Sequence, residues 1–275
     1  TCATFAIRGL MNYPQLAATL VDDWLGTRPR RVGLGGGQGA GKSTLAALIE
    51  RAAAERGLRL IAVGLDDFYR TRAERRRLAE TVPPLLETRG PRGTHDSRRL
   101  AEAIAALSHR GVVRLPVFDK GSDDRSGERV VRGPFDVILL EGWCVGAPPL
   151  DRSTLDRPLN DLERQEDPDG RWRRFVADRL EHDYQSIWAS LDRLVTLLVP
   201  DLACVRRWRL DQESERPVSQ RLDAAAVDRF VQHYERVTRA MLATPRRENE
   251  LHVVLGRDHA VEALDGEVSD APPGG

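Results

Sequence analysis

A glycine-rich run near the start of the chain constrains the fold more than any other stretch. It follows the apolar residues Val32 and Leu34 and reads Gly36, Gly37, Gln38, Gly39, Ala40, Gly41, Lys42, Ser43 and Thr44. This is the Walker A pattern, in which glycines let successive N–H groups point at phosphate oxygens and a helix presents its positive end. We therefore expect a strand, a phosphate-binding loop and a helix, with Lys42 at the β- and γ-phosphates and Ser43 on Mg²⁺.

The lysines of the chain favour this interpretation over a glycine-rich turn that happens to carry a basic residue. Of the 42 basic residues, only Lys42 and Lys120 are lysines, and the other 40 are arginines. Where arginine fills nearly every basic role, a lysine is expected at a place that needs a compact ammonium. Both lysines are therefore candidates for a functional role.

Composition excludes several classes of function. The 275 residues carry 42 acidic and 42 basic side chains, so no net field favours a nucleic acid or a membrane as partner. No stretch approaches the roughly 18 apolar residues needed to span a bilayer. The three cysteines, at positions 2, 144 and 204, lack metal-ligand spacing and predict a reduced, cytoplasmic protein. The oligomeric state stays open.

The periodicity of apolar residues predicts alternating helices and strands. Helices are expected at residues 14–25, 71–81, 96–110, 171–191, 202–212 and 219–242, and strands at 58–65, 135–140, 193–199 and, as the last, 251–255. Residues 112–134 resemble a hairpin, and residues 148–170 read as loop or short helix. Residues 263–275 read as a disordered tail.

Strands that alternate with helices predict a parallel sheet, and the Walker A loop after an early strand predicts the fold of a P-loop NTPase. The expected class is α/β, a three-layer sandwich with a mostly parallel sheet flanked by helices and with helical insertions. We expect one domain over residues 1–262, with a lid at about 201–221.

Three carboxylates follow buried strands of this expected sheet. Asp66 and Asp67 come after the strand at 58–65, and Glu141 follows the strand at 135–140. Ligands bind at the carboxyl ends of parallel strands, and phosphoryl transfer needs a metal ligand and a proton acceptor there. Glu141 is the candidate ligand of Mg²⁺, unless it pairs with an arginine. Adjacent residues face opposite ways, so we favour Asp66 as the base, with Asp67 as the alternative.

The ordered set of motifs resembles a known group of kinases. The Walker A loop, the run at 66–69 and the run at 141–143 together are similar to the phosphoribulokinase, uridine kinase and pantothenate kinase group. Within it, the D-glycerate 3-kinase family is the closer match. The residues that carry this resemblance lie at 93–96, 116–120, 124–125, 140–143, 208–209 and 212–213, and they span most of the chain.

The resemblance implies that ATP and Mg²⁺ bind and that the γ-phosphoryl group passes to a hydroxyl of a small hydroxy acid, D-glycerate first. It implies Asp66 as the base. Residues expected at the acceptor are Asp67, Tyr69, His95, Asp96, Lys120 and Arg125, since a carboxylate needs cations and donors. Asp96 has helix capping as an alternative role. Lid arginines are expected among Arg206, Arg207 and Arg209, and Arg209 is the one we name as catalytic.

Two alternatives to a glycerate kinase remain at the level of sequence. A kinase of the same fold would phosphorylate another acceptor, such as a nucleoside, a sugar phosphate or a pantothenate-like acid. A non-catalytic switch would use the nucleotide state to reorder a loop. Residues 216–219 also depart from the G-M-S-like turn of the plant-type enzymes, which bears on the lid more than on the chemistry.

Overall fold

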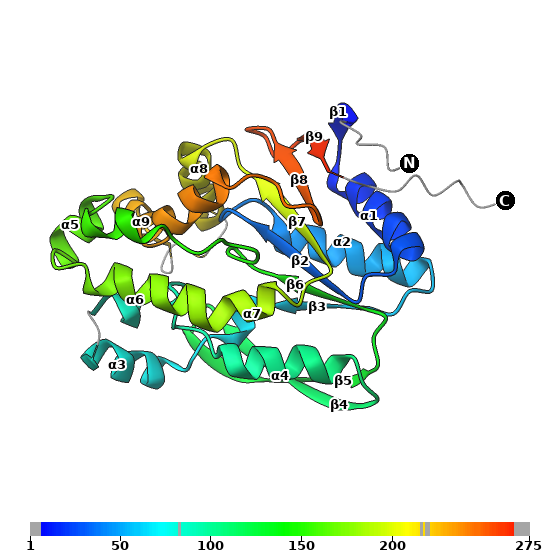
Figure 1. The fold of residues 1–275 in the computed structure, drawn as a ribbon, viewed down its shortest axis with the longest axis horizontal. Helices are drawn as coiled ribbons and strands as arrows, with labels where there is room; N and C mark the ends of the chain where they lie inside the picture. The colour runs from blue at the N-terminus through cyan, green and yellow to red at the C-terminus, as the bar shows by residue number, and fades with distance from the viewer. Residues whose placement is uncertain (1–6, 82–83, 215–216, 218–220, 267–275) are drawn as a thin grey trace.

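The computed structural model describes residues 7–81, 84–214, 217 and 221–266 (Figure 1). At its centre is a seven-stranded sheet in the order β1-β9-β8-β7-β2-β6-β3. The strands are β1 (Ile7–Met11), β2 (Arg31–Gly36), β3 (Leu60–Gly64), β6 (Val137–Glu141), β7 (Arg193–Leu198), β8 (Glu250–Leu255) and β9 (Val261–Asp265). Strands β8, β7, β2, β6 and β3 run parallel, whereas β1 and β9 pair antiparallel at one edge.

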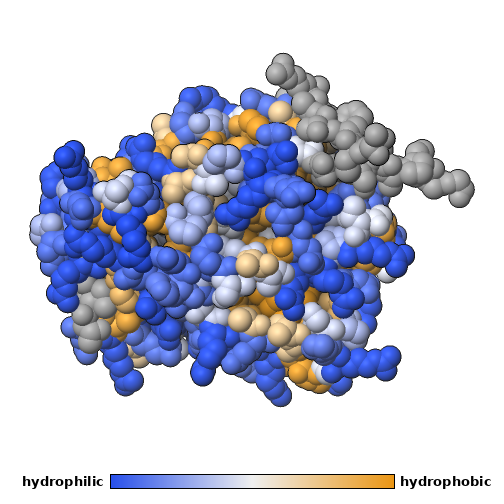
Figure 2. All heavy atoms as spheres, in the orientation of Figure 1, coloured by the Kyte–Doolittle hydropathy of each residue, from blue (hydrophilic) through white to orange (hydrophobic). Residues whose placement is uncertain are grey.

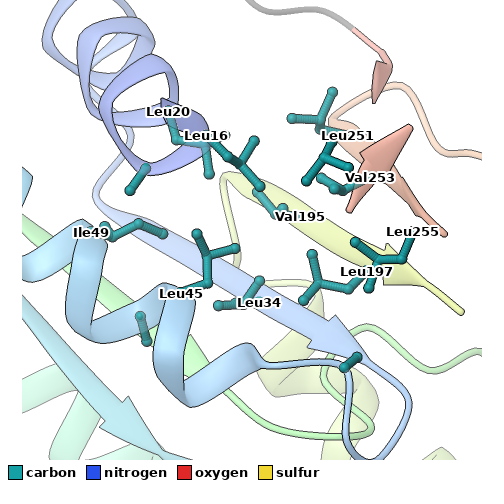
Figure 3. Close-up of a cluster of buried hydrophobic side chains, with 14 of the residues drawn as sticks. Leu16, Leu20, Leu34, Leu45, Ile49, Val195, Leu197, Leu251, Val253 and Leu255 are labelled. Carbon is teal, nitrogen blue, oxygen red and sulfur yellow. The ribbon is translucent and has the colours of Figure 1, made fainter. Parts of the chain in front are cut away.

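One face of the sheet is covered by α1 (Tyr13–Thr27) and α2 (Lys42–Glu55), which lie side by side (Figure 1). Helix α1 begins at a capping box, in which Asn12 and Gln15 satisfy each other's backbone N–H groups. Its apolar residues recur at helical spacing and pack on the sheet. In Figure 3, Leu16 and Leu20 of α1 and Leu45 and Ile49 of α2 meet the buried side chains of the central strands.

Further helices cover the other face of the sheet. They include α4 (Ser97–Leu107), α6 (Arg171–Arg179), the π-helical turn η4 (Leu180–Tyr184), α7 (Gln185–Trp188) and part of α9 (Ala224–Ala243). Strands β4 (Gly111–Asp119) and β5 (Asp124–Gly133) form a separate antiparallel hairpin beside α4. The remaining helices are α3 (Arg72–Thr81), α5 (Asp161–Glu166) and α8 (Leu202–Ser214), with short 3₁₀ turns η1 (Leu65–Phe68), η2 (Pro84–Glu87) and η3 (Arg152–Asp156).

The predicted fold class is confirmed, because a mostly parallel sheet lies between two layers of helices. Every helix of the described residues is too short or too polar to cross a lipid bilayer. The face shown in Figure 2 is largely hydrophilic, with hydrophobic residues in scattered patches.

Several predicted boundaries need correction. Strand β9 follows β8, so the strand at 251–255 is not the last, and regular structure continues to Asp265, past the predicted tail boundary at 263. The strand predicted at 58–65 ends at Gly64, and the next residues form η1. Strand β1 precedes the predicted N-terminal helix. The predicted helix start at 219, most of the turn at 216–219 and the tail from 267 lie outside the described residues.

Candidate active site

The glycine-rich run forms a loop between β2 and α2, as its spacing predicts. Helix α2 begins at Lys42, and Gly41 caps it in the left-handed region with φ of 77°. A side chain at Gly41 would also meet the Tyr13 ring, because a Cβ there lies 2.7 Å from it. Lys42 Nζ donates to the Gly37 carbonyl at 2.8 Å, so the ammonium lies inside the loop. The first N–H groups of α2 therefore face the space where a phosphate would bind.

Two aromatic residues hold this loop from outside. The Tyr13 hydroxyl donates to the Ala40 carbonyl at 2.5 Å, and His259 Nε2 donates to the Gly39 carbonyl at 2.8 Å. The Trp208 ring stacks on His259 with 4.0 Å between centroids. Each bond gives a carbonyl of the loop a donor from elsewhere in the chain, which helps to fix the loop conformation. Neither Tyr13 nor His259 belongs to the Walker A pattern, and the predicted site lacks both.

Ser43 and Glu141 meet beside the loop. The Ser43 hydroxyl donates to Glu141 Oε1 at 2.9 Å, although the two residues are 98 positions apart. Strands β2 and β6 are parallel neighbours, so the end of β6 lies next to the start of α2. Burial raises the pKa of Glu141, and the Lys42 ammonium opposes that shift. Burial also lowers the pKa of Lys42, against the attraction of Glu141 and Asp66.

Asp66 lies in η1, directly after β3, and faces Lys120 from the turn of the β4–β5 hairpin. Lys120 Nζ and Asp66 Oδ2 are 2.7 Å apart. Burial would raise the pKa of Asp66, but the charge and hydrogen bond of Lys120 outweigh it and lower the pKa to about 2. Asp66 is therefore ionised near neutral pH. Its other oxygen, Oδ1, is buried and has no hydrogen-bond partner among the described residues.

These groups line one pocket of about 320 Å³. From the predicted site it contains residues of the phosphate loop together with Asp66, Tyr69, Lys120, Glu141 and Arg209. The predicted site lacks other lining residues, which are Arg89, Gly142, Trp143, Gln212, Phe230 and Tyr234. The pocket thus joins a phosphate loop to one ionised carboxylate and several cations, which is the equipment of phosphoryl transfer.

Known proteins resemble this chain along most of its length. No protein-family profile matches the sequence. A Schizosaccharomyces pombe protein named as an uncharacterised kinase is 32% identical over 226 residues, in a match that covers 75% of this chain and 79% of that protein. The chloroplastic D-glycerate 3-kinase of Arabidopsis thaliana is 30% identical over 235 residues, with 78% of this chain and 48% of that protein covered.

The solved structure of D-glycerate 3-kinase from Cryptococcus neoformans superposes with a TM-score of 0.78 at 26% identity, over 93% of this chain and 99% of that one. The chain belongs to the same family of P-loop kinases as the Schizosaccharomyces pombe protein, and D-glycerate 3-kinases are among its relatives. It is thus a P-loop kinase that uses ATP and acts on a small molecule, which confirms the predicted family and the enzyme class.

Three of the residues predicted at the acceptor lie behind the pocket of this kinase. His95 is buried, stacks on Tyr69 at 4.3 Å between centroids, and its Nδ1 is 2.8 Å from the Tyr184 hydroxyl. Asp96 caps α4 by accepting from the Arg99 N–H. Arg125 donates to the Tyr69 carbonyl at 2.9 Å and lies 3.5 Å from Asp96. These side chains surround Tyr69, so their contacts support the wall of the pocket.

Asp67 contacts the hairpin through one of its carboxylate oxygens. Its Oδ1 accepts from the Phe118 N–H at 3.3 Å, and burial raises its pKa. The two adjacent carboxylates therefore differ in environment, although they lie in the turn η1 and not, as predicted, at the end of a strand with alternating side chains. Asp66 faces the lysine and the pocket, and Asp67 ties η1 to β4.

The three candidate lid arginines of α8 separate in the structure. Arg209 lines the pocket, lies 4.9 Å from the centroid of the Phe230 ring, and pairs with Glu213. Arg206 pairs with Asp228 at 2.9 Å, and Arg207 donates to the Arg257 carbonyl. Arg209 is therefore the member of this trio that can reach a transferring phosphoryl group. Its catalytic role stays a prediction.

Proposed function

We propose that this kinase transfers the γ-phosphoryl group of ATP to a hydroxyl of a small hydroxy acid, with D-glycerate as the first acceptor. The observation that carries the proposal is the Asp66–Lys120 pair at 2.7 Å, which faces the phosphate loop across one pocket. The carboxylate can accept the proton that an acceptor hydroxyl loses, and the cation beside it favours an acceptor that carries negative charge. The named glycerate kinases among the relatives point to the same acceptor.

In the proposed reaction the acceptor hydroxyl oxygen attacks the γ-phosphorus, the bond to the β–γ bridging oxygen breaks, and ADP leaves. The hydroxyl proton passes to Asp66. While Lys120 pairs with Asp66, the low pKa makes this carboxylate a weak base. An acceptor that draws Lys120 away from Asp66 raises the pKa of Asp66, so binding of the acceptor itself activates the base.

Lys42 and Arg209 supply positive charge to the phosphoryl group. Lys42 comes from the start of α2 and Arg209 from α8, and both line the pocket. The negative charge of the transition state is spread over the phosphoryl oxygens, and fixed cations stabilise it without reorganisation.

Ser43 and Glu141 fit a magnesium ion. They present a hydroxyl and a carboxylate oxygen 2.9 Å apart at the loop, and Mg²⁺ prefers one or two such oxygen ligands together with substrate phosphates. When bound, the ion neutralises charge on the β- and γ-phosphates. The residues of the chain that would hold it are Ser43 and Glu141.

A panel of acceptors tests this proposal. ADP release is measured with ATP, Mg²⁺ and, in separate reactions, D-glycerate, L-glycerate, glycerol, uridine and pantothenate. We expect D-glycerate to give the highest kcat/KM. If uridine or pantothenate exceeds it, the acceptor assignment is wrong, and if every acceptor leaves ADP release at the rate of ATP alone, the kinase proposal for these acceptors fails.

A further inference from the structure

Arg92 is a fully buried arginine whose charged group lacks a partner. The side chain has no exposed surface, and none of its three guanidinium nitrogens, Nε, Nη1 and Nη2, has a hydrogen-bond partner among the described residues. A buried guanidinium without an anion costs several kcal/mol, of the order found when one member of a buried ion pair is removed. Such a group in a folded protein calls for an explanation, and a ligand that completes it is one.

The other fully buried arginines show what is missing. Arg75 Nη2 lies 2.8 Å from a carboxylate oxygen of Asp123, and Arg173 Nη1 lies 3.0 Å from one of Asp167. Each of these arginines thus has a carboxylate from the chain itself. Arg92 has the same burial and the same chemistry, but the carboxylate is absent from the described residues around it.

A tightly built loop aims Arg92 inward. Gly90 has φ of 115°, and a Cβ there would lie 1.8 Å from the Tyr234 hydroxyl, so only glycine fits. The Thr94 hydroxyl donates to the Pro91 carbonyl at 2.6 Å and accepts from the Gly90 N–H at 3.1 Å. The backbone on both sides of Arg92 is therefore fixed, and the guanidinium is positioned before any ligand arrives.

Aromatic rings cover the faces of the guanidinium. Its carbon lies 4.2 Å from the centroid of a Trp143 ring and 5.3 Å from that of Tyr184. Such stacking leaves the N–H edge of a guanidinium available for two parallel bonds to a carboxylate. Trp143 also lines the pocket that holds Asp66, so it touches both the active site and Arg92.

Other unpaired polar atoms gather at the same place. His95 Nε2, Trp143 Nε1 and Asp66 Oδ1 are buried and also lack partners among the described residues. Burial lowers the pKa of His95 to about 3, so this ring adds no charge that would repel or attract an acid near neutral pH. The Trp143 N–H, a ring nitrogen of His95 and a carboxylate oxygen thus accompany the Arg92 guanidinium, which suits an acid that also carries hydroxyl groups.

We infer that Arg92 binds the carboxylate of the acceptor through its N–H edge, and that Trp143 moves aside to admit it from the pocket. This inference rests on the proposed function, since it assumes an acidic acceptor. It makes Arg92 the specificity residue that distinguishes an acid from a neutral alcohol. Arg125, predicted for that role from its sequence position, instead holds Asp96 and the backbone of Tyr69.

The test compares Arg92→Met with the wild-type enzyme on two acceptors, D-glycerate and glycerol, the second of which has hydroxyls but no carboxylate. Methionine keeps the volume and the contact with aromatic rings. We expect the ratio of kcat/KM for D-glycerate over glycerol to fall by about 10²-fold, as for loss of one partner of a buried charge pair. The KM for ATP should stay within about twofold of wild type, because no phosphate contact is touched.

Arg173→Met is the matched control, because it removes a buried arginine whose partner is Asp167. We expect it to lower Tm and to leave the acceptor ratio unchanged; an equal fall of the ratio in this variant would overturn the inference. If Arg92→Met shows no cooperative thermal transition and is therefore not folded, the acceptor ratio is measured with Arg92→Lys instead. A fall of the ratio by at least about tenfold supports the inference, because lysine lacks the planar fork, and an unchanged ratio overturns it.

The experiment distinguishes a failure of the inference about Arg92 from a failure of the proposed function. Wild-type turnover of D-glycerate with an unchanged acceptor ratio in Arg92→Met overturns the role of Arg92 alone. Absence of turnover by the wild-type enzyme with D-glycerate and every other hydroxy acid overturns the proposed function, and the role of Arg92 with it.

Discussion

The nucleotide side and the acceptor side of the pocket are built in opposite ways. On the nucleotide side, Lys42 donates to the Gly37 carbonyl and Ser43 donates to Glu141, so these two hydrogen bonds of the loop are made by the chain itself, and the Gln38 amide is the group there that lacks a partner in the described part of the chain. On the acceptor side, the Arg92 guanidinium and Asp66 Oδ1 are buried without partners among the described residues. The cation of the first region thus has a partner in the chain, whereas the buried cation of the second has none among the described residues, and we propose that a ligand supplies it.

This difference separates recognition of ATP from choice of acceptor. A preformed loop of backbone N–H groups binds any nucleoside triphosphate phosphate and needs little from the rest of the fold. Unpaired buried groups, in contrast, reject a molecule that cannot satisfy them, because their desolvation is then uncompensated. We therefore expect substitutions on the acceptor side to change selectivity and substitutions around the loop to change the use of ATP.

The largest effect is expected from Asp66→Asn, which should lower kcat by about 10³-fold, within the range of a lost general base. The amide has nearly the same shape but cannot accept the hydroxyl proton. The KM for ATP should change by less than about threefold, because Asp66 belongs to the acceptor side. Steady-state ADP release with D-glycerate measures both quantities.

Asp67→Asn is the control for that variant, since the neighbouring carboxylate accepts from the Phe118 N–H and does not line the pocket. It should retain kcat within about tenfold of wild type. If Asp67→Asn loses more activity than Asp66→Asn, the base is assigned to the wrong aspartate.

Glu141→Gln should have the next largest effect, a fall of about 10- to 100-fold in affinity for Mg²⁺, as for loss of an interaction that supports a metal site. The amide oxygen remains a ligand, but its charge is gone. Activity titrated against Mg²⁺ at saturating ATP measures the change. A variant with unaltered Mg²⁺ dependence would remove Glu141 from the metal site.

Tyr13→Phe should raise the KM for ATP by about fivefold, because it removes one hydrogen bond of about 1 kcal/mol from the loop. Burial raises the pKa of Tyr13 to about 12, so the hydroxyl is a donor throughout the usual pH range. The acceptor ratio should not change. Thr27→Val removes another hydroxyl bond of the same helix, to the Asp23 carbonyl, and should leave the KM for ATP as it is.

The smallest effect concerns stability and pH. The lowered pKa of Asp66 stabilises the fold above the ordinary pKa of about 3.8, and this contribution is lost as pH falls toward about 2. Lys120→Met should therefore lower the free energy of unfolding at pH 7 by about 1 kcal/mol or less, since Lys120 is half-exposed. The difference from wild type should shrink as pH falls below 4.

Urea denaturation at several pH values measures this difference. Arg98→Met, which removes a more exposed cation 3.9 Å from Glu102, is the matched control and should show almost no change at any pH. A Lys120→Met deficit that stays constant from pH 7 to pH 3 would mean that Asp66 is not the group stabilised by Lys120.

The sequence predicted the nucleotide side well because that side is local. Residues 36–44 are contiguous, and their glycines and lysine carry the geometry with them. Asp66 and Glu141 were predictable because parallel strands bring their carboxyl ends to one edge. The antiparallel edge formed by β1 and β9 was not predictable from the sequence. Strand β1 is short, and its partner β9 lies about 250 residues later in the chain.

The acceptor side depends on contacts that spacing does not reveal. His95, Asp96 and Arg125 have the residue types of a binding site, but tertiary packing uses them to support Tyr69 and α4. Arg92 stands three residues before His95, and only its burial without a partner distinguishes it from the other arginines. In a chain with 40 arginines, residue type alone carries little information.

The most direct test of the account is the identity of the phosphorylated product. A reaction of the wild-type enzyme with ATP, Mg²⁺ and D-glycerate is followed by ³¹P nuclear magnetic resonance until ATP is consumed. The account predicts one phosphomonoester resonance of phosphoglycerate for each ADP formed. Release of inorganic phosphate with no phosphoglycerate signal would contradict it.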